Sequence, residues 1–252
     1  MENAPELGAP EGAECEAHQQ RQLKITHSVS SQHGIASHRG IEIGVLEWSL
    51  QHTYDKRAGL HTAGSLMLYE ELSPGLAVTC PALLMRNTTD DPTWTSFIYH
   101  DHVSWFPGAG YVVEKLFREH YAERYLASAV GSFRDLPDRK RFFSQISTLK
   151  PEDWLPGSVD AIATSSADGR RIVIKAVNYQ AEPNTLLVQL EGTHAPEHAA
   201  ATLHTLSERL TDAASLEHPN AIAPVSRPFN YGKDFAVDLG PYTVAVLEIR
   251  AE

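Results

Sequence analysis

Residues 41–50 read Ile-Glu-Ile-Gly-Val-Leu-Glu-Trp-Ser-Leu, and this stretch decides the fold of the chain. Its β-branched and aliphatic residues, with Gly44 among them, predict a short buried strand of the kind found in parallel sheets. Glu47 follows at the carboxyl end of the strand, where parallel α/β proteins gather their active sites. The same position also suits a solvated acid at a strand end, so the local pattern leaves both interpretations of Glu47 open.

The composition bounds the size and the partners of the protein. The chain has 252 residues, of which 42% are hydrophobic, enough for one large domain or two modest ones. A net charge of −11 disfavours nucleic acid and anionic membranes as partners. No apolar stretch reaches 18 residues, and residues 1–20 lack the basic start and apolar region of a secretory signal. We therefore expect a cytoplasmic protein without a membrane partner.

The first half of the chain alternates between strand and helix patterns. Residues 1–20 are rich in Glu, Ala, Gly and Pro, which predicts a disordered leader. After the strand at 41–46, apolar spacing predicts a helix over 56–72, a second buried strand over 78–84 and a helix over 111–121. Such alternation is typical of an α/β fold.

The pattern changes near residues 122–126. Beyond this point several runs alternate polar and apolar residues, and Asp168-Gly169 is a hairpin signal. Such short strands predict an antiparallel β-sandwich. Their predicted ranges are 170–179, 186–190, 235–239 and 242–249. The expected domains are thus 1–20 as leader, 21–121 as an α/β part and 122–252 as a β-sandwich.

Several side chains compete as functional candidates. His100-Asp101-His102 and His194-x-x-x-His198 have ligand-like spacing, but the first lacks further ligands and Pro196 interrupts the second. We therefore predict neither a metal nor a cofactor. The tryptophans near the ends of the α/β elements can stack against a sugar face or simply pack in the core; they are Trp48, Trp94 and Trp105.

Taken together and in order, a series of motifs resembles family 51 of the glycoside hydrolases, the α-L-arabinofuranosidases. The resemblance runs from about residue 40 to 249. The motifs that carry it are Leu46-Glu47-Trp48, Arg57-Ala58-Gly59-Leu60-His61-Thr62-Ala63-Gly64, Pro81-Ala82-Leu83-Leu84, Ser104-Trp105-Phe106-Pro107, Tyr111-Val112-Val113-Glu114-Lys115-Leu116-Phe117, Asp212-Ala213, Asn220-Ala221-Ile222-Ala223-Pro224-Val225 and Pro241-Tyr242-Thr243-Val244.

The resemblance implies a (β/α)₈ TIM barrel followed by a β-sandwich, and a hydrolase of carbohydrate and L-arabinose metabolism. It implies retaining release of terminal non-reducing arabinofuranosyl residues from arabinose-containing polysaccharides and oligosaccharides. In such a mechanism one carboxylate attacks the anomeric carbon and a second acts as acid and then as base. Glu47 matches the family's nucleophile, at the end of the seventh barrel strand. Trp48, Trp94 and Trp105 are the substrate-binding candidates.

The chain departs from the family in one respect that concerns catalysis. The family's acid/base glutamate follows an asparagine well upstream of the nucleophile, and this sequence contains no Asn-Glu dipeptide. About 40 residues precede Glu47, whereas a complete barrel takes roughly 250 residues. We therefore expect an incomplete barrel, formed by 21–121, without an acid/base residue in this chain.

Two functions from different classes remain open at this point. The chain is an arabinofuranosidase fragment, inactive alone, whose partner is an N-terminal barrel fragment or a second copy of itself. Alternatively, it is a non-catalytic remnant whose β-sandwich serves as an interaction or glycan-binding module.

Overall fold

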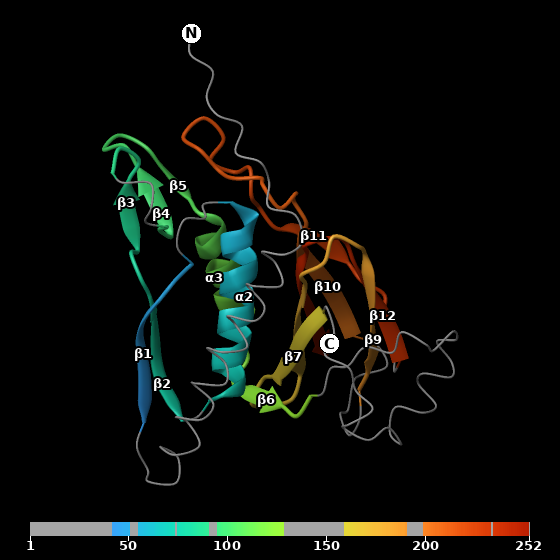
Figure 1. Ribbon diagram of the computed structural model, residues 1–252. Coiled ribbons are helices and arrows are strands. Elements are labelled where there is room, and N and C mark those ends of the chain that lie inside the picture. Colours follow the sequence, from blue (N-terminus) through green and yellow to red (C-terminus); the bar gives the residue numbers. More distant parts are fainter. Residues whose placement is uncertain are drawn as a thin grey trace.

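The computed structural model describes residues 42–50, 55–73, 75–90, 95–128, 159–190, 199–232 and 234–251. Over these ranges the protein is mostly β-sheet with few helices (Figure 1). None of the helices in these ranges is long and apolar enough to cross a membrane. The predicted leader, residues 1–20, lies outside the described residues.

The α/β part begins with one strand–helix–strand unit. Strand β1 (Ile43–Trp48) pairs in parallel with β2 (Leu76–Pro81), and helix α2 (Lys56–Glu71) connects them. Helix α3 (Ala109–Glu119) follows a small three-stranded sheet of β3 (Met85–Asn87), β4 (Ile98–His100) and β5 (Trp105–Pro107). The predicted strand over 41–46 and helices over 56–72 and 111–121 are confirmed to within about two residues, whereas the strand predicted over 78–84 already ends at Pro81. Strand β4 lies where the sequence left a short strand and the rim of a pocket both open, and β3 and β5 were not predicted.

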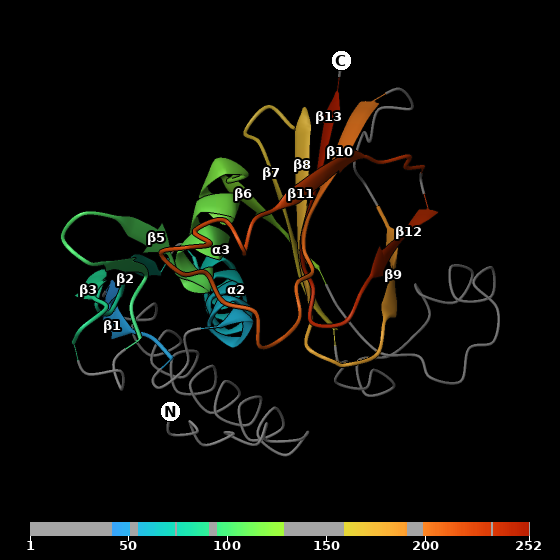
Figure 2. The ribbon, with the colours of Figure 1, turned by 90° about the horizontal axis from the view of Figure 1, so that it is seen from above.

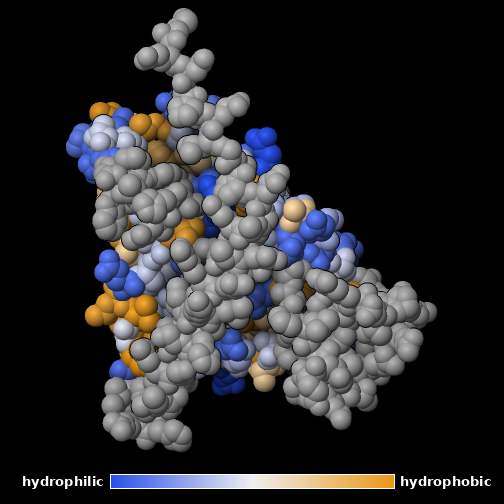
Figure 3. All heavy atoms as spheres, viewed as in Figure 1, coloured by the Kyte–Doolittle hydropathy of each residue, from blue (hydrophilic) through white to orange (hydrophobic). Residues whose placement is uncertain are grey.

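The predicted burial of the first two strands is wrong. Leu46 of β1 is 72% exposed and Val78 of β2 is 45% exposed. Among the described residues these two strands pair only with each other, so apolar side chains suited to a covered parallel sheet remain open to solvent. Figure 3 shows hydrophobic residues at the surface along the left edge, over β1 and β2.

The rest of the chain builds two antiparallel sheets. The larger has the strand order β11-β10-β13-β8-β7-β6. Its strands are β6 (Arg124–Leu126), β7 (Val159–Ser165), β8 (Arg171–Asn178), β10 (Ala199–Leu206), β11 (Val225–Pro228) and β13 (Val244–Ala251). The smaller pairs β9 (Asn184–Gln189) with β12 (Asp234–Leu239). The predicted hairpin turn is confirmed between β7 and β8, where Gly169 has a φ of 72° that suits glycine.

Viewed from above, the elements form layers (Figure 2). The two helices lie between the β1–β2 pair and the six-stranded sheet, and β9–β12 covers the opposite face of that sheet. Side chains along β8 point alternately to the two faces of the sheet, and both faces are apolar. Ile172 and Ile174 pack toward β12, whereas Val173 and Val177 pack toward the helices, so each face is covered by another layer.

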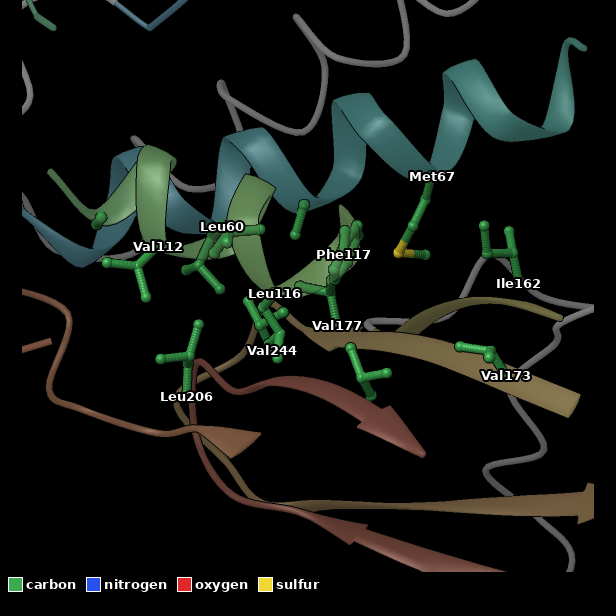
Figure 4. Packing of buried hydrophobic residues seen from close by; sticks show 14 of the residues in the cluster. Leu60, Met67, Val112, Leu116, Phe117, Ile162, Val173, Val177, Leu206 and Val244 are labelled. Atoms are coloured by element: carbon green, nitrogen blue, oxygen red, sulfur yellow. The ribbon is translucent and has the colours of Figure 1, made fainter. Parts of the chain in front are cut away.

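The core against the helices crosses the boundary predicted near residue 122. Leu60 and Met67 of α2 and Leu116 of α3 share one cluster with Val177 and Val244 of the sheet (Figure 4). Close approach of the two helices depends on glycine, since a Cβ added at Gly110 would lie 2.9 Å from Thr62 Oγ1. The predicted domain division stays a prediction, and the two parts share this core.

One buried charge also joins the two parts. Lys175 of β8 is fully buried and forms an ion pair with Glu70, near the carboxyl end of α2. Its Nζ lies 4.8 Å from the ring centre of Phe117. Burial lowers the pKa of Lys175, and the Glu70 carboxylate opposes that effect.

Candidate active site

The end of β1 carries an irregularity that exposes Glu47. Between Val45 and Trp48 the strand advances three residues while β2 advances two, from Thr79 to Pro81. Val45 and Trp48 both pack into one aromatic cluster, whereas Leu46 and Glu47 between them are exposed. Bulges of this kind are frequent beside active sites because they redirect a side chain. Here the irregularity places a carboxylate in the open at the carboxyl end of a parallel strand.

Trp48 anchors this strand end from the other side. It is 8% exposed and packs edge-on against Tyr69 and Phe97, with ring centres 5.6 and 5.9 Å away. Its carbonyl oxygen accepts a hydrogen bond of 2.8 Å from the Ala82 amide, just after β2. Packing is therefore the observed role of Trp48, and its contact with a sugar stays a prediction.

The other two tryptophans differ from Trp48 in their surroundings. Trp105 of β5 is 58% exposed, so its ring offers a free face. Trp94 lies outside the described residues. The substrate-binding roles of both remain predictions.

Helix α2, which follows Glu47 in the chain, is fixed firmly at its amino end. Asp55 caps the helix by accepting from the Arg57 amide at 3.0 Å and also pairs with the Arg57 guanidinium at 2.8 Å. Lys56 is buried and donates to Glu208 at 2.7 Å. Burial lowers the pKa of Lys56, against the effect of Glu208. These contacts hold the helix start against the loop that contains Asp212, whose carbonyl oxygen accepts from the Lys56 amide.

Other acids of the helical part lie at the wrong end to assist Glu47. Glu70 is committed to Lys175, and Glu71 ends the helix. A 16-residue helix is about 24 Å long, so both stand far from the amino end of α2, which follows β1. Burial raises the pKa of Glu71, and the charge of Asp160 raises it further. A raised pKa suits a general acid, but Glu71 lies too far from Glu47 for that role.

A cleft among the described residues also lies at that far end. It has a volume of about 760 Å³, and its lining includes Tyr69, Val78, Glu114 and Arg118 but not Glu47. Burial raises the pKa of Glu114 in this cleft. The cleft therefore does not belong to the predicted carboxylate site.

Of the two histidine pairs with ligand-like spacing, only His100 and His102 lie among the described residues. His100 and His102 sit in a hydrogen-bonded turn, where the His102 amide donates to His100 Nδ1 and His102 Nε2 bonds the Asn87 amide nitrogen. Within the described ranges no third ligand joins them. His194 and His198 lie outside those ranges. The structure instead gathers His120, His204 and Glu248, which sequence spacing gave no reason to connect.

The fold of the described residues is similar to that of several solved arabinofuranosidases. The structure resembles a family 51 arabinofuranosidase from Xanthomonas axonopodis pv. citri with a TM-score of 0.73 and 17% identity, covering 96% of this chain and 48% of that one. It resembles the thermostable α-L-arabinofuranosidase from Thermotoga petrophila with a TM-score of 0.68 and 19% identity, covering 94% and 48%.

The Thermotoga maritima enzyme, solved as an arabinose complex, gives the same TM-score at 18% identity. No protein-family profile and no curated protein matches the chain. The chain thus spans about half the length of the solved structures that it matches, consistent with a C-terminal part of them. The predicted resemblance to family 51 is confirmed in the fold.

Proposed function

We propose that the chain is the C-terminal part of a retaining α-L-arabinofuranosidase, with Glu47 as its nucleophile. The β1–α2 and β2–α3 units are then the last strand–helix units of an incomplete (β/α)₈ barrel. The two antiparallel sheets form the C-terminal β-sandwich. The observation that carries this proposal is the exposed Glu47 at the carboxyl end of β1, the position where barrel enzymes place catalytic groups.

In this proposal the site supplies the nucleophile of a retaining glycosidase but not its acid/base residue. The Glu47 carboxylate attacks the anomeric carbon, and a second carboxyl group about 5–5.5 Å away protonates the leaving oxygen in a retaining enzyme. Glu70 and Glu71 stand at the far end of α2, and Asp55 is held by Arg57. We therefore assign the acid/base role to another polypeptide segment, one that carries the remaining barrel strands.

The exposed apolar surface supports a missing neighbour. Leu46 and Val78 lie on a sheet whose edges have no further strand among the described residues, and such edges invite pairing with other strands. An N-terminal barrel portion fits these edges better than a second copy of the chain, because the remaining parallel strands of a closed barrel pair with β1 on one side and with β2 on the other. The proposed substrate is an arabinose-containing oligosaccharide or polysaccharide, and the proposed location is the cytoplasm.

The chain alone should not hydrolyse an aryl α-L-arabinofuranoside at an enzymatic rate. General acid assistance is typically worth about 10²–10⁴-fold, and positioning of the sugar by the remaining walls contributes about 7–11 kcal/mol. The test compares purified chain with its Glu47→Ala variant on a nitrophenyl arabinofuranoside. Turnover well above that of the variant would overturn the assignment of the acid to another segment.

The second candidate is a non-catalytic module built on the antiparallel sheets. The exposed Trp105 favours glycan binding without chemistry, because an open aromatic ring can stack on a sugar, but it lies on β5 of the α/β part and not on these sheets. Retention of the chain on an arabinan affinity gel, lost in Trp105→Ala but kept in Glu47→Ala, would support the module. The coding sequence upstream separates the candidates, since a barrel portion with an Asn-Glu motif favours the enzyme.

A further inference from the structure

Three polar side chains, His120, His204 and Glu248, converge on the face of the six-stranded sheet that packs against the helices. Strands β10 and β13 pair with Thr202 opposite Glu248 and His204 opposite Val246. His204 and Glu248 are therefore diagonal neighbours on one face, the face on which Val246 packs against the helices. His120, the residue that caps the carboxyl end of α3, lies next to these two side chains.

The potential ligand atoms of these residues lie close together. One nitrogen from each histidine and one Glu248 oxygen are all within 4.8 Å of one another. His120 Nδ1 and Glu248 Oε2 are in direct hydrogen-bond contact, and the two imidazole centres are 4.1 Å apart. Four ligands at about 2.0–2.1 Å around a tetrahedral zinc ion stand about 3.3 Å from one another. Movements of about an ångström bring the three atoms to that spacing.

The surroundings orient the ligands as metal sites require. His204 Nδ1 bonds Ser226 Oγ at 2.7 Å, which occupies one ring nitrogen and leaves Nε2 for a ligand. Arg250 bonds Glu248 through Oε1, so the carboxylate is held while Oε2 faces His120. The Glu248 side chain is 4% exposed and the His120 side chain 15%, so the group is shielded but reachable from solvent.

We propose that His120, His204 and Glu248 bind a divalent ion of the zinc class, which fastens the end of α3 to β10 and β13. Two imidazoles and one carboxylate are a ligand set that zinc accepts, with water in the fourth position. The ion takes the place of the hydrogen bond between His120 and Glu248, and the proton of that bond leaves to solvent. None of the three residues belongs to the elements that hold Glu47, so this site does not rest on the proposed function.

Zinc titration of the tag-free, chelator-treated full chain tests the site. We expect one equivalent of Zn²⁺ to bind by calorimetry, and Co²⁺ in its place to give the visible bands of a tetrahedral site. His204→Gln should weaken Zn²⁺ binding by at least about 100-fold, since even loss of an outer hydrogen bond costs about 10–100-fold. His102→Gln is the matched control and should leave the affinity unchanged, because His102 lies in the β4–β5 turn.

A second variant covers the case in which His204→Gln does not fold, as judged by circular dichroism. Ser226→Ala alters an exposed side chain and should still weaken binding by about 10–100-fold. Absence of a bound equivalent in the parent chain would overturn the site. The same affinity in Ser226→Ala and in a folded His204→Gln, or loss of binding in His102→Gln, would overturn it as well.

Discussion

Removal of Glu70 should destabilise the protein strongly, although Glu70 is partly at the surface. Its carboxylate neutralises Lys175, which is fully buried between α2 and the sheet. Breaking a buried pair from one side costs about 3–5 kcal/mol. Since the Glu70 side chain is itself 20% exposed, we place Glu70→Ala near the lower end, at about 3 kcal/mol. That is a large share of a typical stability of about 5–15 kcal/mol.

Urea unfolding followed by circular dichroism measures this loss. The exposed pair Lys115–Glu119 on α3, 3.6 Å apart, supplies the matched control, and Glu119→Ala should change the free energy of unfolding by less than about 0.5 kcal/mol. Lys175→Met should cost less than Glu70→Ala, because the charge left behind then belongs to a side chain that is 20% exposed and not to a fully buried one.

The cost of Glu70→Ala should also shrink as pH rises. Burial lowers the pKa of Lys175, so the folded state releases its proton before the unfolded state does, near 10.5. Glu70→Ala removes the charge that opposes this effect, so the pKa of Lys175 falls further in the variant. The stability of the variant therefore increases with pH over a wider range than that of the parent, and the difference between them shrinks. A loss within about 0.5 kcal/mol of zero for Glu70→Ala would refute the importance of this pair.

Two further changes probe the helix layer. Gly110→Ala should lower the free energy of unfolding in urea by about 1–3 kcal/mol, because the new methyl group would press on Thr62. The control is Gly232→Ala, where the nearest atom to the added methyl group is 3.9 Å away. Equal losses in the two variants would contradict the close helix contact. Burial raises the pKa of Tyr69 to about 12, so between pH 10 and about 12 the unfolded state holds fewer protons and stability should fall with rising pH, by up to about 1.4 kcal/mol per pH unit. Tyr69→Phe should remove that slope, and an unchanged slope would show that Tyr69 is not its source.

The sequence correctly predicted the elements whose formation depends on local residues alone. Helix α2 was predicted from its apolar spacing and the β7–β8 turn from Asp168-Gly169, whereas the Asp55 cap of α2 is seen only in the structure. The exposure of β1 was not predictable, because burial depends on what covers a strand and the apolar run suits a covered one. Strand β10 carried small and polar residues without a clear alternation, so its position beside β13 follows only from the folded sheet.

Only those features of the candidate site that depend on local sequence were predictable. The position of Glu47 at a strand end follows from local sequence, and the structure adds the irregularity that exposes it. The burial of Trp48 depends on Tyr69 and Phe97, which lie far along the chain. The cluster of His120, His204 and Glu248 joins three elements through sheet register and helix packing, and no spacing in the sequence encodes it.

Addition of the proposed N-terminal barrel portion gives the most direct test of Glu47. In a complex or fusion that supplies the remaining strands and an Asn-Glu motif, Glu47→Gln should lower kcat/KM for an aryl arabinofuranoside by several orders of magnitude, because the covalent route disappears. Glu42→Gln, a change at an exposed acid that precedes the same strand, should stay within about tenfold of the parent. Activity of Glu47→Gln within about tenfold of the parent would show that Glu47 is not the nucleophile.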